Sequence, residues 1–132
     1  MQRKHPSIAK CSTGFTLIEL LVVLAILALL ATLTIPRYFQ SIDKGKETVL
    51  LENLRTTRES IDKFYADTAR YPDSLSELVE RKYLKALPID PITESASTWL
   101  IIPPAEGQQG QVYNLQSGAQ GQRADGKPYR SL

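Results

Sequence analysis

Cysteine and histidine are almost absent from the chain, which has one of each among its 132 residues, Cys11 and His5. Both lie in the first fourteen residues, ahead of a long apolar block. If this front part is removed, the remaining chain can form no disulfide, no thiolate metal site and no catalytic triad that depends on histidine. The composition therefore speaks against several common metal-dependent and hydrolytic functions.

A strongly basic surface is also missing, although the formal net charge is +2. Arg3, Lys4 and Lys10 lie in the first fourteen residues, which contain no acidic residue. The remaining 13 basic and 14 acidic side chains nearly balance one another. No basic stripe remains that could bind nucleic acid through its phosphates, so we expect no nucleic-acid partner.

One long apolar run is present, from Phe15 to Ile35, and Pro36 follows it. It contains 21 residues and a single charged side chain, Glu19. At about 1.5 Å per residue, this length crosses a hydrocarbon core about 30 Å thick. The basic residues before the run favour an N-terminus in the cytoplasm. The run therefore predicts a membrane-spanning helix.

Three simpler interpretations of this N-terminus are a secretory signal, a lipoprotein signal at Cys11 and a plain membrane anchor. A secretory signal needs a shorter apolar run followed by small residues, which only the segment from Ala28 to Thr32 approaches. No apolar run precedes Cys11. Two features are not explained by a plain membrane anchor. Gly14 directly precedes the run, and Glu19 lies inside it, where an unpaired carboxylate is costly and invites a functional explanation.

The hexapeptide from Gly14 to Glu19, GFTLIE, resembles the prepilin processing motif of type IV pilins and type II secretion pseudopilins. In that family a dedicated peptidase cuts after the glycine and methylates the new N-terminal phenylalanine, and the glutamate guides assembly. The resemblance implies cleavage between Gly14 and Phe15, N-methylation of Phe15 and an assembly role for Glu19. It also implies that Pro36 is the proline that disturbs the helix in this family.

Physical chemistry is consistent with this resemblance. Cleavage after Gly14 creates an ammonium group at Phe15. In a helical bundle of staggered subunits, this ammonium group can meet the Glu19 carboxylate of a neighbouring subunit. Each charge is then neutralised in an apolar environment, which favours one register over the others.

The helical pattern continues past Pro36, so we expect one long helix from about Phe15 to about Asp67. Its first half is apolar all round, and its second half has one apolar stripe that covers a small domain. The positions expected in or near this stripe are Tyr38, Ile42, Val49, Leu54, Thr57, Ile61, Phe64 and Tyr65.

The rest of the chain predicts a small domain of mixed structure. The segment from Ser74 to Glu77 matches a capping box and predicts a short helix that runs to about Tyr83. Segments 98–102 and 111–115 predict an antiparallel β-hairpin, and the tail after it is loop-like. The predicted fold is therefore α+β and type IV pilin-like, with a long N-terminal helix packed on a small C-terminal domain.

The pattern and the resemblance together predict three parts. We expect residues 1–14 to be a basic leader that is removed and residues 15–36 to be a transmembrane and assembly helix. We expect residues 37–132 to be a periplasmic pilin-like domain, which includes the second half of the long helix.

Four later motifs resemble the major, G-type pseudopilin of type II secretion: Tyr71-Pro72, the segment from Pro88 to Thr93, Trp99, and Ser117-Gly118. The resemblance implies a structural subunit, without enzyme activity, of a periplasmic filament that works with an outer-membrane secretin to export folded proteins. The implied partners are identical subunits, minor pseudopilins, the prepilin peptidase and an inner-membrane assembly platform with its ATPase. Two alternatives stay open: a type IV pilin for adhesion, twitching or DNA uptake, and a single-span anchor of an unrelated periplasmic binding domain or enzyme.

The resemblance also raises the question of a calcium ion, which major pseudopilins commonly hold near the tail. Calcium prefers about six to eight oxygen ligands, usually with several carboxylates. After Glu106 the chain offers only Asp125 as an acid, and it lacks a terminal tryptophan. We therefore expect no strong cofactor site. Asp125, Ser117 and the carbonyl groups of 115–118 are the candidate ligands of a weak calcium site, and Asp125-Gly126 is otherwise a tight turn.

Two patterns imitate catalytic sites. Residues 121–127 resemble a phosphate-binding loop, but Pro128 stands where serine or threonine is required. Glu77 and Glu80 are three residues apart on the predicted short helix and could imitate a pair of catalytic carboxylates. We interpret both glutamates as solvated surface residues.

Overall fold

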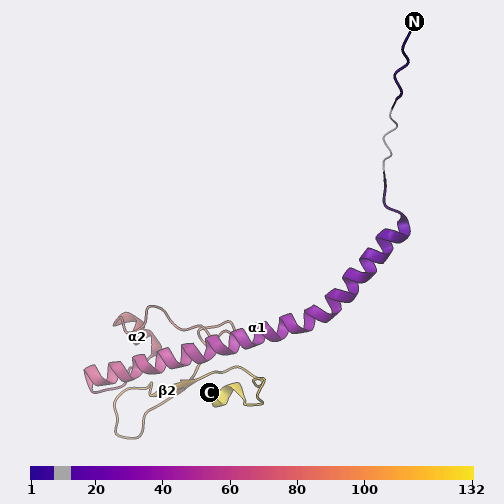
Figure 1. Cartoon of the computed structure of the whole chain (residues 1–132). Helices are drawn as coiled ribbons and strands as arrows, with labels where there is room; N and C mark the ends of the chain where they lie inside the picture. Colours follow the sequence, from indigo (N-terminus) through magenta and orange to yellow (C-terminus); the bar gives the residue numbers. More distant parts are fainter. Residues whose placement is uncertain (8–12) are drawn as a thin grey trace. The chain divides into compact units, whose positions relative to one another are not determined.

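The structure is a computed structural model that describes residues 1–7 and 13–132. Its elements are, in chain order, α1 (Leu17–Thr68), α2 (Leu75–Glu80), β1 (Leu100–Ile102), β2 (Asn114–Gln116) and a short 3-10 helix, η1 (Tyr129–Ser131) (Figure 1). The chain divides into two compact units, Met1–Phe39 and Gln40–Leu132, and α1 has residues in both.

The predicted long helix is confirmed as α1, which continues through Pro36. A proline has no amide N–H, so one carbonyl group of the preceding turn loses its intrahelical donor. Two threonines in this region bond to the backbone of their own helix. The Thr32 hydroxyl donates to the Leu29 carbonyl at 2.6 Å, and the Thr34 hydroxyl donates to the Ala31 carbonyl at 3.1 Å. The hydroxyl groups of Thr32 and Thr34 therefore find acceptors within the helix itself, although they lie in an apolar run.

The buried stripe of α1 in the Gln40–Leu132 unit follows spacings of four and three residues. Its apolar and hydroxyl members are Leu50, Leu54, Thr57, Ser60, Ile61 and Phe64. The prediction is correct for Leu54, Thr57, Ile61 and Phe64. It is wrong at Val49, which is 49% exposed, because Val49 lies one position off the stripe that Leu50 begins. The other predicted positions, Tyr38, Ile42 and Tyr65, are also exposed.

The capping motif starts α2 where the sequence predicts. The Ser74 hydroxyl accepts the backbone N–H of Glu77 at 3.3 Å, which satisfies one of the free donors of the first turn. The helix ends at Glu80 rather than near Tyr83. Lys82 adopts a left-handed conformation with φ of 64°, which cannot continue a right-handed helix.

The predicted antiparallel hairpin is also confirmed, with Leu100 opposite Gln116 and Ile102 opposite Asn114. Both strands are shorter than expected, and β2 begins three residues later. The reason is that the amide groups of Gln111 and Val112 donate to the Pro72 carbonyl, at 3.0 and 2.9 Å, instead of to β1. The chain is therefore tied to the turn after α1 before it can pair as a strand.

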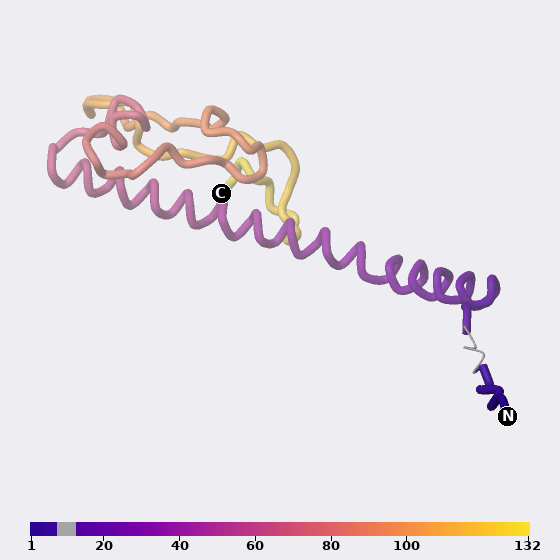
Figure 2. Tube along the Cα trace, turned by 90° about the horizontal axis from the view of Figure 1, so that it is seen from above, coloured from indigo at the N-terminus to yellow at the C-terminus, as the bar shows by residue number. Residues whose placement is uncertain are grey.

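In both views the residues after Thr68 run back along the part of α1 that belongs to the Gln40–Leu132 unit (Figures 1 and 2). They enclose one core with it. Its buried members are Leu50, Leu54, Ile61, Phe64, Tyr71, Leu75, Leu78, Trp99, Val112 and Leu115. This arrangement confirms the predicted α+β architecture.

Candidate functional site

A capping box formed by Thr16 and Glu19 closes the first turn of α1. The Thr16 hydroxyl accepts the backbone N–H of Glu19 at 3.2 Å, and the Glu19 carboxylate accepts the backbone N–H of Thr16 at 3.4 Å. The first N–H groups of a helix have no acceptor within the helix, so this reciprocal pair stabilises its start. The Glu19 carboxylate also lies at the positive end of the helix dipole. Its charge therefore has local partners in the single chain.

Thr16 is a site residue that the sequence reasoning missed. The signal was present, because Thr-x-x-Glu is the same local pattern as the Ser-x-x-Glu that locates α2. The resemblance to a processing motif assigns a role to the Glu19 carboxylate and none to Thr16.

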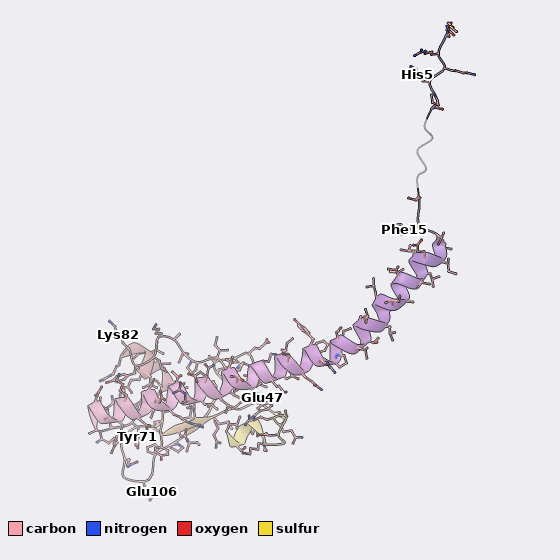
Figure 3. The ribbon with its side chains drawn as sticks, in the orientation of Figure 1. His5, Phe15, Glu47, Tyr71, Lys82 and Glu106 are labelled. Atoms are coloured by element: carbon pink, nitrogen blue, oxygen red, sulfur yellow. The ribbon has the colours of Figure 1, made fainter. Side chains whose placement is uncertain are left out.

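In the segment before α1, the described residues 1–7 and 13–16 are not helical and are exposed. Lys10 and Cys11 lie outside the described residues. Phe15 is 86% exposed at the junction with α1 (Figure 3). A Cβ atom added at Gly14 would meet no atom within 4 Å. The packing of the chain itself therefore does not explain why position 14 is glycine.

The apolar side chains of α1 in the Met1–Phe39 unit are open. From Leu17 to Ile35, every leucine, isoleucine and valine side chain is at least 46% exposed. The most apolar 18-residue stretch of α1 contains no buried residue, and its length and composition suit a membrane crossing. An apolar surface of this length needs lipid or protein to cover it.

Three of the later motifs meet around Asp90, which is completely buried. Its carboxylate accepts the Ser117 hydroxyl at 2.5 Å and the backbone N–H of Ile92 at 2.9 Å. Close by in the sequence, the Trp99 indole N–H donates to the Pro88 carbonyl at 2.8 Å. Hydrogen bonds thus join the segment from Pro88 to Thr93 to both Trp99 and Ser117, and the buried Asp90 carboxylate has partners.

Two glycines in the same unit are required by close contacts between backbone segments. A Cβ atom at Gly118 would lie 1.9 Å from the Thr98 carbonyl oxygen. One at Gly110, where φ is +103°, would lie 2.2 Å from the Tyr71 carbonyl oxygen. No side chain fits at either position. The two glycines therefore allow direct contact between backbone segments, at Thr98 and at Tyr71, inside the domain.

Arg58 attaches the C-terminal segment to α1. Its guanidinium group donates to the backbone carbonyl oxygens of Leu115 and Leu132, both at 2.9 Å, and to the Asn114 side chain at 2.8 Å. Arginine carries several donors in a fixed planar arrangement, so one side chain can join several acceptors.

Glu47 makes the second attachment, and it is only 8% exposed although it is an acid (Figure 3). Its carboxylate lies 3.6 Å from Nε of Arg123 and accepts the backbone N–H of Ala124 at 3.1 Å. The sequence reasoning missed this residue. The available signal was its position, because Glu47 lies three residues before Leu50 and continues the buried stripe of α1.

The residues considered for calcium do not fit a metal ion. Asp125 forms the predicted tight turn with Gly126, and its carboxylate lies 3.4 Å from Nη1 of Arg123. The Leu115 carbonyl faces Arg58, and the Ser117 hydroxyl is directed to Asp90. A divalent cation at these oxygens would meet two guanidinium groups. Outside residues 8–12, no group of three or more His, Cys, Asp or Glu side chains is arranged to hold a metal ion.

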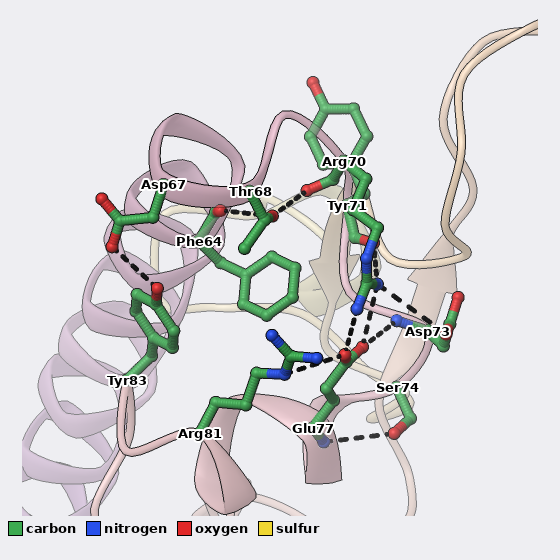
Figure 4. Close-up of polar contacts among 10 residues, drawn as sticks. All are labelled: Phe64, Asp67, Thr68, Arg70, Tyr71, Asp73, Ser74, Glu77, Arg81 and Tyr83. Carbon is green, nitrogen blue, oxygen red and sulfur yellow. Dashed lines mark hydrogen bonds and ion pairs between the residues drawn. The ribbon is translucent and has the colours of Figure 1, made fainter.

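Glu77 corrects a second expectation, since it is not a solvated surface residue. Its side chain is 14% exposed and forms an ion pair with Arg70 and a longer one, at 3.4 Å, with Arg81 (Figure 4). The hydrogen bond from Arg70 is the main cause that lowers the pKa of Glu77, against the raising effect of its burial. Glu80 is exposed, as predicted. The two glutamates are therefore not a catalytic pair, and Glu77 fastens α2 to the end of α1.

Residues 9–35 match the family described as the prokaryotic N-terminal methylation motif. The type II secretion system core protein G of Pseudomonas aeruginosa is 34% identical over 107 residues, which cover 69% of this chain and 71% of that protein. The chain belongs to the type II secretion system core protein G family. The core protein G of Klebsiella pneumoniae is 31% identical over 124 residues, 82% of this chain and 85% of the relative.

A similarity to pilins is also found, but it covers less. The type IV major pilin protein PilA of Myxococcus xanthus is 34% identical over 65 residues, which cover 49% of this chain and 30% of that protein. No solved structure gives a significant match. The resemblance to G-type pseudopilins, within the type IV pilin family, is confirmed.

Proposed function

We propose that this chain is a structural subunit of a type II secretion pseudopilus, a periplasmic filament that drives export of folded proteins through an outer-membrane secretin. The observation that carries the proposal is the match to core protein G over 71% of that protein, together with the methylation motif. We expect no enzyme activity, because the buried acids Glu47 and Asp90 and the partly buried Glu77 are each engaged in holding the fold.

The proposal includes processing between Gly14 and Phe15. Hydrolysis of this peptide bond leaves a carboxylate on Gly14 and an ammonium group on Phe15. After this nitrogen loses a proton, it takes a methyl group from an external methyl donor, and the methylated amine is again protonated. The bond lies in an exposed, non-helical segment directly before the capping box, which suits access by a protease. A residue without a side chain at position 14 lets the peptidase approach the backbone closely.

Assembly then exchanges the partners of Glu19. Before assembly, its carboxylate bonds to the Thr16 N–H of its own chain. In the filament it pairs with the Phe15 ammonium group of a neighbouring subunit, while the exposed apolar side chains of α1 leave lipid and pack against other subunits. This exchange keeps the carboxylate bonded in both states, which limits the cost of placing a charge in an apolar environment.

The proposed topology is a single crossing of the inner membrane by α1, with the N-terminus in the cytoplasm and the Gln40–Leu132 unit in the periplasm. The proposed partners are identical subunits, minor pseudopilins, the prepilin peptidase and an inner-membrane assembly platform with its ATPase. The basic leader supports this orientation. The exposed apolar surface of α1 supports contacts with other subunits.

Deletion of the gene, followed by complementation, tests the function. We expect the deletion to abolish export of folded proteins into the medium and to leave twitching motility and surface pili unchanged. Mass spectrometry of the complementing protein should find a methylated Phe15 as its first residue. Loss of pili with normal export would instead identify a type IV pilin. A mature N-terminus elsewhere would contradict the proposed processing.

A further inference from the structure

The polar attachment of the C-terminal segment, residues 114–132, to α1 depends on few side chains. In the part of the chain that the structure describes, every hydrogen bond and ion pair between this segment and α1 involves Arg58 or Glu47. From the segment, the Arg123 guanidinium group and the Ala124 backbone N–H lie against the Glu47 carboxylate. The polar contacts of this segment with α1 therefore depend on two guanidinium groups and one buried carboxylate, beside the apolar packing of Leu115 in the core.

The pair of Glu47 and Arg123 is largely buried, with side chains that are 11% and 23% exposed. Nε of Arg123 is a buried atom without a hydrogen-bond acceptor in residues 1–7 and 13–132, and it is compensated by the Glu47 carboxylate at 3.6 Å. A buried ion pair adds little over an apolar pair, but removal of one partner is strongly destabilising because it leaves a buried charge without compensation. The two residues thus depend on each other.

We propose that Arg58 and Arg123 do in this chain what a metal ion would do, so that its fold is independent of divalent cations. A metal ion gathers carbonyl and carboxylate oxygens from separate segments around one positive centre. Here such oxygens gather around guanidinium groups: the Leu115 and Leu132 carbonyls at Arg58, and the carboxylates of Glu47 and Asp125 at Arg123. The arginine side chain keeps its charge at all ordinary pH values and needs no bound ion.

The experiment uses the full chain in detergent and two measurements, the Tm from circular dichroism and amide hydrogen exchange of residues 114–132. Each is made with excess chelator and with millimolar calcium. The variants are Arg58→Gln and Arg123→Gln. The matched control is Arg130→Gln, which removes the same charge from an exposed residue of the same segment.

We expect chelator and calcium to give the unmodified chain Tm values within about 1 °C of each other. Arg123→Gln should lower the Tm by at least about 5 °C, because the largely buried Glu47 carboxylate loses its charged partner and keeps only the Ala124 N–H. Both Arg58→Gln and Arg123→Gln should speed exchange in the segment by more than about tenfold. Arg130→Gln should change neither measurement. If Arg123→Gln does not fold, Arg123→Lys, which keeps the charge without the planar fork, should fold and show faster exchange than the unmodified chain.

Two results would overturn the proposal. The first is a calcium-dependent rise of several degrees in the Tm of the unmodified chain that is lost in Asp125→Asn. The second is exchange in Arg58→Gln and Arg123→Gln that equals exchange in Arg130→Gln. The test is independent of the proposed secretion function, because it measures the fold of a single chain and requires neither processing nor assembly.

Discussion

In the Met1–Phe39 unit the motif residues Gly14 and Phe15 are open to solvent, whereas in the Gln40–Leu132 unit the motif residues Asp90 and Ser117 are completely buried. The apolar side chains differ as well: those from Leu17 to Ile35 are all exposed, whereas the second unit encloses an apolar core with members from Leu50 to Leu115. A residue that its own fold does not require is explained by a partner, such as a peptidase, lipid or another subunit. A residue enclosed by its own fold is explained by stability. The exposure of a motif residue therefore indicates whether the residue serves an external partner or the stability of its own fold.

The largest expected effect in the first unit comes from Glu19→Ala. We expect it to abolish filament assembly, measured by cross-linking and sedimentation, because the Phe15 ammonium group loses its proposed partner. Membrane insertion should be unchanged or improved, since a charge is removed from the apolar run. The free energy of unfolding of the Gln40–Leu132 unit should change by less than about 0.5 kcal/mol.

Glu19→Gln is the matched control for this prediction. Its side-chain oxygen can still accept the Thr16 N–H, so the capping box is kept while the charge is lost. Assembly should fail for this variant as well. Normal assembly of Glu19→Gln would show that helix capping, and not charge pairing, is what assembly requires.

The same substitution at two glycines sharpens the comparison. Gly118→Ala should lower the free energy of unfolding by at least about 3 kcal/mol, because the added methyl group collides with the Thr98 carbonyl. Gly14→Ala should change it by less than about 0.5 kcal/mol, since nothing lies within 4 Å. Urea denaturation of the uncleaved chain, followed by the fluorescence of Trp99, the single tryptophan, measures both. Equal effects of the two substitutions would remove the distinction between the two units.

Local patterns in the sequence predicted the elements well. The apolar run and its helical continuation predicted α1, and the Ser-x-x-Glu pattern predicted the start of α2. These signals depend only on residues that are three or four positions apart. The prediction of which residues form the buried stripe was less accurate. Val49 and Leu50 are adjacent apolar residues, and only the packing of the folded domain determines that Leu50 is the buried one.

The contacts that hold the tail could not be predicted in this way. Ala124 lies 77 positions from Glu47, and Leu132 lies 74 positions from Arg58. Their pairing depends on the path of the whole chain after α1. The strand boundaries were missed for a related reason, since the Pro72 carbonyl takes two amide groups that a local pattern assigns to β2.

A smaller effect is expected from Asp90→Ala. The substitution leaves the Ser117 hydroxyl and the Ile92 amide group buried without an acceptor, so we expect a loss of about 1–3 kcal/mol in the free energy of unfolding. Asp62→Ala, at an exposed position of α1, is the control and should be nearly neutral. Filament assembly under conditions where the variant is folded should be normal. An assembly defect in the folded variant would mean that the Asp90 cluster also contributes to a contact between subunits.

The smallest effect is the pH dependence contributed by Glu77. Hydrogen bonds and charge from Arg70 hold its pKa in the folded state below the ordinary value of 4.5. The folded state therefore binds fewer protons than the unfolded state in this range. The resulting stabilisation is fully present above pH 4.5 and is lost as the pH falls through the lower, folded-state pKa. Acid should thus weaken the attachment of α2 to α1.

The variant Glu77→Gln tests this contribution against Glu80→Gln on the exposed face of the same helix. At about pH 7, Glu77→Gln should have a slightly lower Tm than the unmodified chain, and the difference should shrink as the pH approaches about 3. Glu80→Gln should show no such trend. A Tm of Glu77→Gln that equals the Tm of the unmodified chain at every pH would contradict the charge contribution. It would assign the role of Glu77 to packing and to its bond with the backbone N–H of Asp73, because a neutral amide oxygen can also accept that hydrogen bond.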